Sequence, residues 1–353
     1  MNARVLVLAA CLLPGACAET PPATSEGFAG LGRTSDAYAQ VVPGRVFSFP
    51  ADHGAHPGFR IEWWYVTANL ADAQGNDYGI QWTLFRYGLR PGEGAAGWGN
   101  GTIWMGHAGL TTPGGHHAAE RLARGGVGQA GVEAAPFQAW IDDWMLAGPP
   151  EAAMQVRAAG GDFAYSLQLE SRGPLVLQGE GGFSLKSADG QASYYYSHPF
   201  LHASGVLEID GRRVQVSGPA WMDREWSSQP LAGDQRGWDW FSLRLEEGTR
   251  LMLFQLRHAD GGRYLSGTWI GADGSSTPLS TGDIRLRPLA RTTLAGREVP
   301  TRWALSVPAR GFEVEVSAVN PGSWMALGTP YWEGPVRVRG SAPGVGYLEM
   351  TGY

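Results

Sequence analysis

Apolar and polar residues alternate along most of the chain, with a period of two rather than 3.6 residues. Segments with this pattern include RIEWWYVTANL, YGIQWTLFRYGL, DFAYSLQLESR, FSLRLEEGTRLMLFQLR and GFEVEVSAVN. Successive side chains of a strand point to opposite faces, so the pattern predicts strands that each bury one face. The pair Asp210-Gly211 is typical of a tight hairpin turn. The clearest helical candidate, residues 280–290, is short and also fits a strand. We therefore predict an all-β protein.

The length and a faint internal repeat predict two domains. A chain of 353 residues, with 52 glycines and 23 prolines for turns, is long enough for two β-domains. In each half a Glu-Trp pair precedes a strand and an arginine follows, first with Glu62 and Arg86, then with Glu225 and Arg257. This repeat fits two similar antiparallel β-barrels or sandwiches in tandem. We place them at residues 44–203 and 204–353, with YLEMTGY as the closing strand of the second.

The N-terminal segment predicts export. Arg4 precedes an apolar run, residues 5–13, that is too short to span a bilayer. Cleavage after Ala18 would give a soluble periplasmic protein, whereas lipidation of Cys17 would tether it to the membrane, and the sequence leaves both open. Residues 19–43 are polar and small and predict a flexible tether. Both cysteines lie in the first 18 residues, so no disulfide or thiol nucleophile is expected beyond them.

Charge and motifs exclude several classes of function. The net charge is −6 and no basic cluster occurs, which argues against nucleic acid and anionic membrane surfaces as partners. No G-x-S-x-G or G-x-G-x-x-G motif supports a nucleophile-elbow hydrolase or a dinucleotide site. His116-His117 lacks the spacing of a zinc motif. We expect no metal, no cofactor and a monomer.

The segment GPAWMDREWSSQP concentrates charge in a chain that is otherwise poor in it. In a strand, alternation would place one acid beside an indole in a dry cavity, where its pKa rises and it keeps a proton for general acid catalysis. The same residues also fit a hydrogen-bonded plug of one barrel end, with the acids around Arg224 and the tryptophans as packing. The alternation puts Trp221, Asp223 and Glu225 on one face and Met222, Arg224 and Trp226 on the other.

Three aromatic clusters, EWWY, SYYYSHP and GWDWF, predict a cavity. Tyr and Trp carry polar tips that resist full burial, so many together are more easily housed around a cavity than inside a closed core. We predict a substrate site near the domain junction, with side chains from each cluster. Its candidate residues are Trp221, Tyr194, Tyr196, Trp64, Glu62, Trp238 and Trp240.

The segments HPGFRIEWWYVTANL, SYYYSHPFLHASG, GPAWMDREW, GWDWF and YWEGPVRVRG to GVGYLEMTGY resemble the AttH-like, or hydroxyneurosporene synthase, family, whose members are often labelled predicted secreted hydrolases. The resemblance covers nearly the whole exported chain and implies two lipocalin-like (calycin) domains. It also implies carotenoid 1,2-hydratase-like chemistry, in which a protonated aspartate delivers a proton to an alkene. By this resemblance the aspartate is Asp223 and the aromatic residue before it is Trp221. The family's His and Trp pair falls on Tyr194 and Tyr196, and its tyrosine before the aspartate is a tryptophan here.

Three functions follow as hypotheses. The first is an enzyme of hydratase or cyclase type that binds a polyene, isoprenoid or lipid, with Asp223 as acid and with Glu225 and Arg224 holding it in place. The second is a periplasmic carrier of apolar molecules, in which Asp223 would be ionised and paired with Arg224. The third is an envelope-assembly protein without a cavity.

Overall fold

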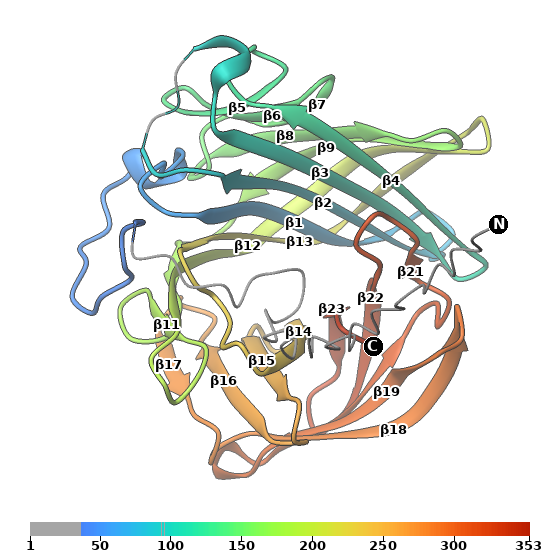
Figure 1. Ribbon diagram of the computed structural model, residues 1–353. Helices are drawn as coiled ribbons and strands as arrows, with labels where there is room; N and C mark the ends of the chain where they lie inside the picture. The colour runs from blue at the N-terminus through green and yellow to red at the C-terminus, as the bar shows by residue number, and fades with distance from the viewer. Residues whose placement is uncertain (1–36, 93, 95) are drawn as a thin grey trace, which may run out of the picture.

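The computed structural model describes residues 37–92, 94 and 96–353 (Figure 1). The prediction of an all-β protein is confirmed, because the helical elements of the described residues are the short 3₁₀ turns η2 (Ala51–His53), η3 (Gly97–Gly99) and η4 (Pro308–Arg310). Residues 280–290, for which the sequence allowed either a short helix or a strand, lie mostly in β18 (Arg285–Leu294). Among the described residues, no helix is both long and apolar enough to cross a membrane.

The first sheet is antiparallel and has 13 strands in the order β4-β3-β2-β1-β13-β12-β9-β8-β7-β6-β5, with β10 and β11 pairing with β12. It curls over its own apolar core, to which its strands contribute alternate residues such as Trp64 and Val66 (Figure 1). Its strands are β1 (Ile61–Ala71), β2 (Asp77–Gly88), β3 (Thr102–Thr112), β4 (Gly115–Arg124), β5 (Ala130–Ala134), β6 (Phe137–Ile141), β7 (Trp144–Ala147), β8 (Ala153–Ala159), β9 (Phe163–Ser171), β10 (Val176–Leu177), β11 (Phe183–Leu185), β12 (Ala192–Ile209) and β13 (Arg212–Ser227).

The second sheet has 10 strands in the order β17-β16-β15-β14-β23-β22-β20-β19-β18, with β21 pairing with β22. It curls almost into a barrel around a core that includes Phe241, Trp303 and Leu348 (Figure 1). The predicted closing strand is confirmed as β23, which pairs with β14 and β22. The strands are β14 (Gln235–Leu245), β15 (Arg250–His258), β16 (Arg263–Ile270), β17 (Ser276–Leu279), β18 (Arg285–Leu294), β19 (Arg297–Val307), β20 (Phe312–Ala318), β21 (Trp324–Met325), β22 (Tyr331–Gly340) and β23 (Gly344–Met350).

Two tandem antiparallel domains are therefore present, but the chain passes from one to the other later than predicted. The predicted boundary at 203/204 falls inside β12, because β12 and β13 form one long hairpin of the first sheet. Its turn is the predicted pair Asp210-Gly211, with φ of 50° and 76°, as a tight hairpin turn requires. β13 then returns along β1, and the second sheet begins at β14.

The hairpin also explains why the internal repeat was misaligned. Glu62 forms an ion pair with Arg86 on the neighbouring strand, as the repeat suggests. In the second half, however, Arg257 pairs with Asp239 of β14 at 3.3 Å, whereas Glu225 belongs to the first sheet. The repeat therefore matches two hairpins, β1–β2 and β14–β15. In the second hairpin the acid that pairs with the arginine is Asp239, not Glu225 as predicted.

The predicted tether, residues 19–43, extends too far toward the domain. Tyr38 is buried and its hydroxyl donates to the carbonyl of Gly88 at 2.6 Å. The amide of Val42 donates to the Tyr194 hydroxyl at 3.0 Å. Residues 38–42 are thus attached to the first domain by specific hydrogen bonds. The predicted export segment, residues 1–18, and residues 19–36 lie outside the described residues.

The two domains meet through faces that point away from their own cores. β1 and β2 of the first sheet lie against β23 and β22 of the second, and β4 lies against β21. Tyr195 of β12 reaches Trp240 of β14 by a hydrogen bond (Figure 1). A separate apolar cluster occupies this contact and draws residues from both sheets, among them Tyr65, Tyr195 and Trp221 from the first and Trp240, Phe254 and Tyr347 from the second. The junction thus has its own packing, distinct from the two domain cores.

Candidate functional site

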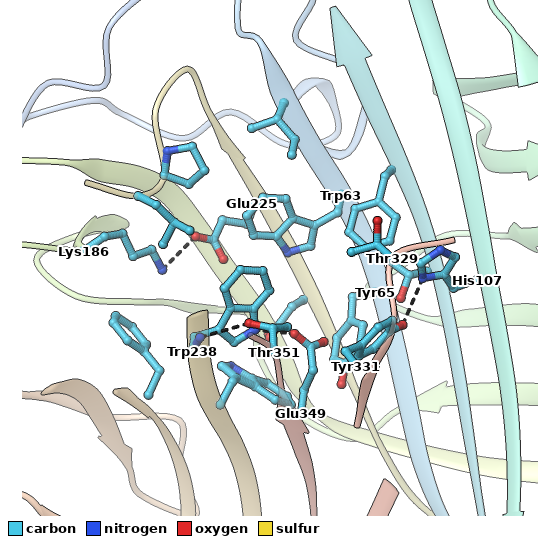
Figure 2. A pocket seen from close by; sticks show the side chains of 18 of the residues that line it. Trp63, Tyr65, His107, Lys186, Glu225, Trp238, Thr329, Tyr331, Glu349 and Thr351 are labelled. Carbon is cyan, nitrogen blue, oxygen red and sulfur yellow. Dashed lines mark hydrogen bonds and ion pairs between the residues drawn. The ribbon is translucent and has the colours of Figure 1, made fainter. Parts of the chain in front are cut away.

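A cavity of about 140 Å³ lies in this junction. Its walls are mainly aromatic and aliphatic, as is typical of sites for apolar ligands. Figure 2 shows carboxyls of Glu225 and Glu349 pointing into the same space, with Lys186 and His107 toward opposite ends of the view. The lining residues are Ile61, Trp63, Tyr65, Thr83, Phe85, Tyr87, Met105, His107, Lys186, Tyr195, Asp223, Glu225, Pro230, Leu231, Trp238, Trp240, Phe254, Leu256, Thr329, Tyr331, Glu349 and Thr351.

The alternation predicted for GPAWMDREW is confirmed in β13. Asp223 and Glu225 line the cavity, and Trp221 packs in the junction cluster beside them. On the other face, Met222 belongs to the core of the first domain. Arg224 is fully buried on that same side. One strand thus supplies both the acids of the cavity and an arginine of the domain interior.

Asp223 is a buried acid surrounded by neutral donors. Its Oδ1 accepts hydrogen bonds from Ser197 Oγ at 2.5 Å and Trp221 Nε1 at 2.6 Å, and its Oδ2 accepts one from the Tyr195 hydroxyl at 2.5 Å. Burial raises the pKa of Asp223 from 3.8 to about 7, although these three hydrogen bonds act to lower it, and the charge of Glu225 raises it further. At neutral pH a large fraction of Asp223 therefore carries a proton.

Arg224 does not hold Asp223, which corrects the role we predicted for it. Its guanidinium points away from the cavity, forms an ion pair with Glu62, and donates to the carbonyl of Gly54 at 2.5 Å. The cation of the cavity is instead Lys186, which lies 2.8 Å from Glu225 and above the ring of Phe254 at 4.3 Å. Glu225 also accepts a hydrogen bond from Ser193.

Glu62 and Trp64 belong to the interior plug rather than to the cavity. Glu62 is fully buried between Arg86 and Arg224, and the two cations hold its pKa well below its usual range although burial alone would raise it. Trp64 stacks under Arg224 at 3.9 Å. Their neighbours Trp63 and Tyr65 line the cavity, because side chains of β1 alternate between the faces. The alternative prediction, a plug of Arg224 with Asp223 and Glu225, is wrong in its acids: the buried network around Arg224 contains Glu62 instead.

Tyr194 and Tyr196 also lie on the far face, and Tyr195 between them lines the cavity. The register explains this. Tyr195 is paired with Glu225, whereas Tyr194 and Tyr196 are paired with Trp226 and Arg224. Three consecutive tyrosines guarantee one on each face, but only the pairing of β12 with β13 decides which face meets the cavity.

Trp238 and Trp240 line the cavity, as predicted. Trp240 Nε1 donates to the Tyr195 hydroxyl at 3.2 Å, which links the second domain to the partner of Asp223. Trp238 Nε1 donates to Glu349. Asp239, between them, points the other way and pairs with Arg257.

Several lining residues were missed by sequence reasoning. Lys186 is the only lysine of the chain, a signal that could have drawn attention to it. Glu349 and Tyr331 lie in the closing segments that carry the family resemblance. His107 comes from β3, which contained no recognised motif. Among the described residues, no group of three or more His, Cys, Asp or Glu side chains is arranged to hold a metal ion.

The model of the AttH-like family matches residues 40–353 of this chain. A crystal structure described as an AttH from Nitrosomonas europaea is similar, with 33% identity, a TM-score of 0.79, and coverage of 89% of this chain and 99% of its own. The structure of kievitone hydratase from Nectria haematococca shares the fold, with 12% identity, a TM-score of 0.65, and coverage of 87% and 92%. No curated protein matches the chain. The chain belongs to the AttH-like family, and its two domains have the fold of these proteins.

Proposed function

We propose that this protein protonates a C=C bond of a long apolar molecule, such as a polyene, an isoprenoid or a lipid, whose reacting segment enters the junction cavity, and that hydration or cyclisation follows. The observation that carries the proposal is Asp223. It is a cavity carboxyl with a pKa raised to about 7, and within the described residues no lysine, arginine or histidine forms an ion pair with it. A carrier has no use for such an acid, since burying a carboxyl without a cation is unfavourable. The fold shared with a hydratase supports the same reaction class.

The reaction requires a proton donor and cavity side chains that stabilise a carbocation. Asp223 gives its proton to one alkene carbon, so that the C=C π bond breaks, a C–H bond forms, and a carbocation develops on the neighbouring carbon. The aromatic side chains of Trp63, Tyr65 and Trp240 line the same cavity as Asp223, and aromatic faces stabilise a cation. In hydration, a water oxygen bonds to the cation and releases one proton. In cyclisation, a second C=C bond attacks instead and a proton is lost from carbon.

The hydrogen bonds around Asp223 fit a donor that must change charge. When Asp223 is protonated on Oδ2, its O–H can point to the alkene while the other lone pair of Oδ2 accepts from the Tyr195 hydroxyl, and after proton transfer Tyr195 still donates to the carboxylate. Ser197 and Trp221 donate to Oδ1 in both states. The carboxyl is therefore held in one orientation before and after the reaction. Lys186 pairs with Glu225 at 2.8 Å, whereas no cation pairs with Asp223 among the described residues.

We also propose that the protein acts outside the cytoplasm, in the periplasm or tethered to the envelope through Cys17. This part of the proposal is supported by the N-terminal sequence alone, in which a short apolar run precedes Ala16-Cys17-Ala18.

The test compares wild-type protein, Asp223→Asn, and the exposed-site control Asp162→Asn, each expressed in the native host. Apolar molecules that co-purify with each protein are extracted and their masses compared. We expect Asp223→Asn to hold a precursor that differs from the wild-type molecule by one water or by ring closure, and Asp162→Asn to match the wild type. If all three proteins carry the same molecule, the protein is a carrier and the acid is structural.

A further inference from the structure

The second domain places two buried carboxyls in the junction, facing the wall that holds Asp223. Glu333 of β22 and Glu349 of β23 are directly opposite each other in the antiparallel register. Glu349 lines the cavity, and its register partner on the neighbouring strand β14 is Trp240. Figure 2 shows the carboxyl of Glu349 directed toward the same space as Glu225. The substrate proposed above therefore lies between acids from both domains.

Glu349 has the properties of a proton acceptor. Its carboxyl accepts a hydrogen bond from Trp238, and among the described residues it forms no ion pair. Burial raises the pKa of Glu349 to about 7, and the nearby charges of Asp223 and Glu225 raise it further, whereas the bond from Trp238 lowers it. Two carboxyls so placed do not both ionise readily, and a state with a proton on Asp223 and none on Glu349 is electrostatically allowed.

Glu333 is paired with Glu349 on the adjacent strand, and its surroundings favour the protonated carboxyl. Its Oε1 accepts a hydrogen bond from the Tyr65 hydroxyl at 2.5 Å, and its Oε2 is buried without a hydrogen-bond partner among the described residues. An unpaired buried carboxylate oxygen is unfavourable, whereas a protonated one can turn its O–H toward a neighbour. Like charges directly opposite on paired strands also destabilise a sheet, which favours a proton shared between Glu333 and Glu349.

We propose that Glu349 takes up the proton released at the end of the reaction. In hydration, the water oxygen that bonds to the carbocation transfers its proton to Glu349, which becomes neutral while Asp223 stays ionised. Glu349 then releases this proton to solvent and Asp223 regains one from solvent before the next turnover, so one proton enters and one leaves per cycle. The inference rests on the proposed function, to which it adds a second catalytic residue.

The first test needs no substrate. Infrared pH titration of the full chain should show two carboxyls that lose their protons near pH 7 in the wild type. We expect Glu349→Gln to remove one of them, and Asp223→Asn to remove the other and shift Glu349 to lower pH. The exposed control Glu170→Gln should leave both unchanged. An unaltered neutral-range signal in Glu349→Gln would overturn the inference.

A further measurement separates catalysis from structure. Glu349→Gln expressed in the host should co-purify with the unreacted precursor, as Asp223→Asn does, whereas Glu170→Gln should carry the wild-type molecule. Wild-type product in Glu349→Gln contradicts the inference. Because Asp223→Asn is scored separately, failure of the proposed function is distinguishable from failure of the role of Glu349.

Discussion

The paired strands β1 and β13 carry a buried carboxyl on each face, and the pKa values of these two carboxyls are shifted in opposite directions. On the inner face, Glu62 lies between Arg86 and Arg224, and its pKa is held well below the usual range. On the cavity face, Asp223 is equally buried but has neutral donors, and its pKa rises to about 7. Burial raises the pKa of both acids, so the cations decide the outcome. A strand that alternates its faces can therefore place a structural ion pair and a proton donor at adjacent residues.

The inner face stabilises the fold by connecting β1 and β13 to the segment before β1. Arg224 stacks on Trp64, pairs with Glu62, and donates to Gly54 just after η2. The ring of His56 stacks on Trp226 with centroids 4.0 Å apart. These contacts tie residues 54–56 to β1 and β13, so a change on this face affects stability, whereas a change on the cavity face affects proton transfer.

Breaking the inner pair should have the largest effect on stability. Arg224→Met leaves Glu62 with one of its two cations, and we expect a loss of about 3–5 kcal/mol in the free energy of unfolding, measured by urea denaturation at pH 7. Asp223→Asn should not lose stability under the same conditions, since no cation partner is removed. A neutral result for Arg224→Met would show that the ion pair does not support the fold.

The pH dependence of stability should separate the two acids. The folded-state pKa of Asp223 lies above its unfolded value of 3.8, so the contribution of Asp223 to stability is full below pH 4 and is lost as pH rises to about 7, by up to about 4 kcal/mol. Asp223→Asn lacks this loss, and should be more stable than the wild type at pH 8 but equal to it near pH 4.

Glu62 should show the opposite dependence. Its pKa is lowered on folding, so its stabilisation is present above its unfolded pKa of 4.5 and is lost as the pH falls below that value. Urea denaturation of wild type and Asp223→Asn between pH 3 and 8 measures both effects. Parallel curves for the two proteins would contradict the raised pKa of Asp223.

A smaller change should sharpen the account of Asp223 itself. The Tyr195 hydroxyl stabilises the ionised carboxyl, so Tyr195→Phe should raise the pKa of Asp223 by about one unit. The variant should keep Asp223 protonated to higher pH, which NMR titration of the side-chain carboxyl carbon measures. A pKa that falls in Tyr195→Phe would mean that the tyrosine favours the neutral acid.

Local alternation predicted much of the fold and half of the site. The period of two predicted the strands and the shared face of Trp221, Asp223 and Glu225. The Asp210-Gly211 pair predicted the turn of the hairpin. It also paired Tyr194 with Tyr196 correctly, but which face meets the second domain depends on the register of β12 with β13, which local sequence does not encode. Lys186 and Glu349 reach the cavity from strands or loops far along the chain, and only tertiary packing brings them together.

The central claim is that Asp223 carries a proton at neutral pH, and NMR titration measures this directly. In wild-type protein labelled with ¹³C at aspartate side-chain carboxyls, NMR titration should show one resonance with a midpoint near pH 7 that is absent from Asp223→Asn. That result would place a proton donor in the cavity at neutral pH. If every aspartate that differs between the two spectra titrates below pH 5, Asp223 is ionised at neutral pH and is not the acid.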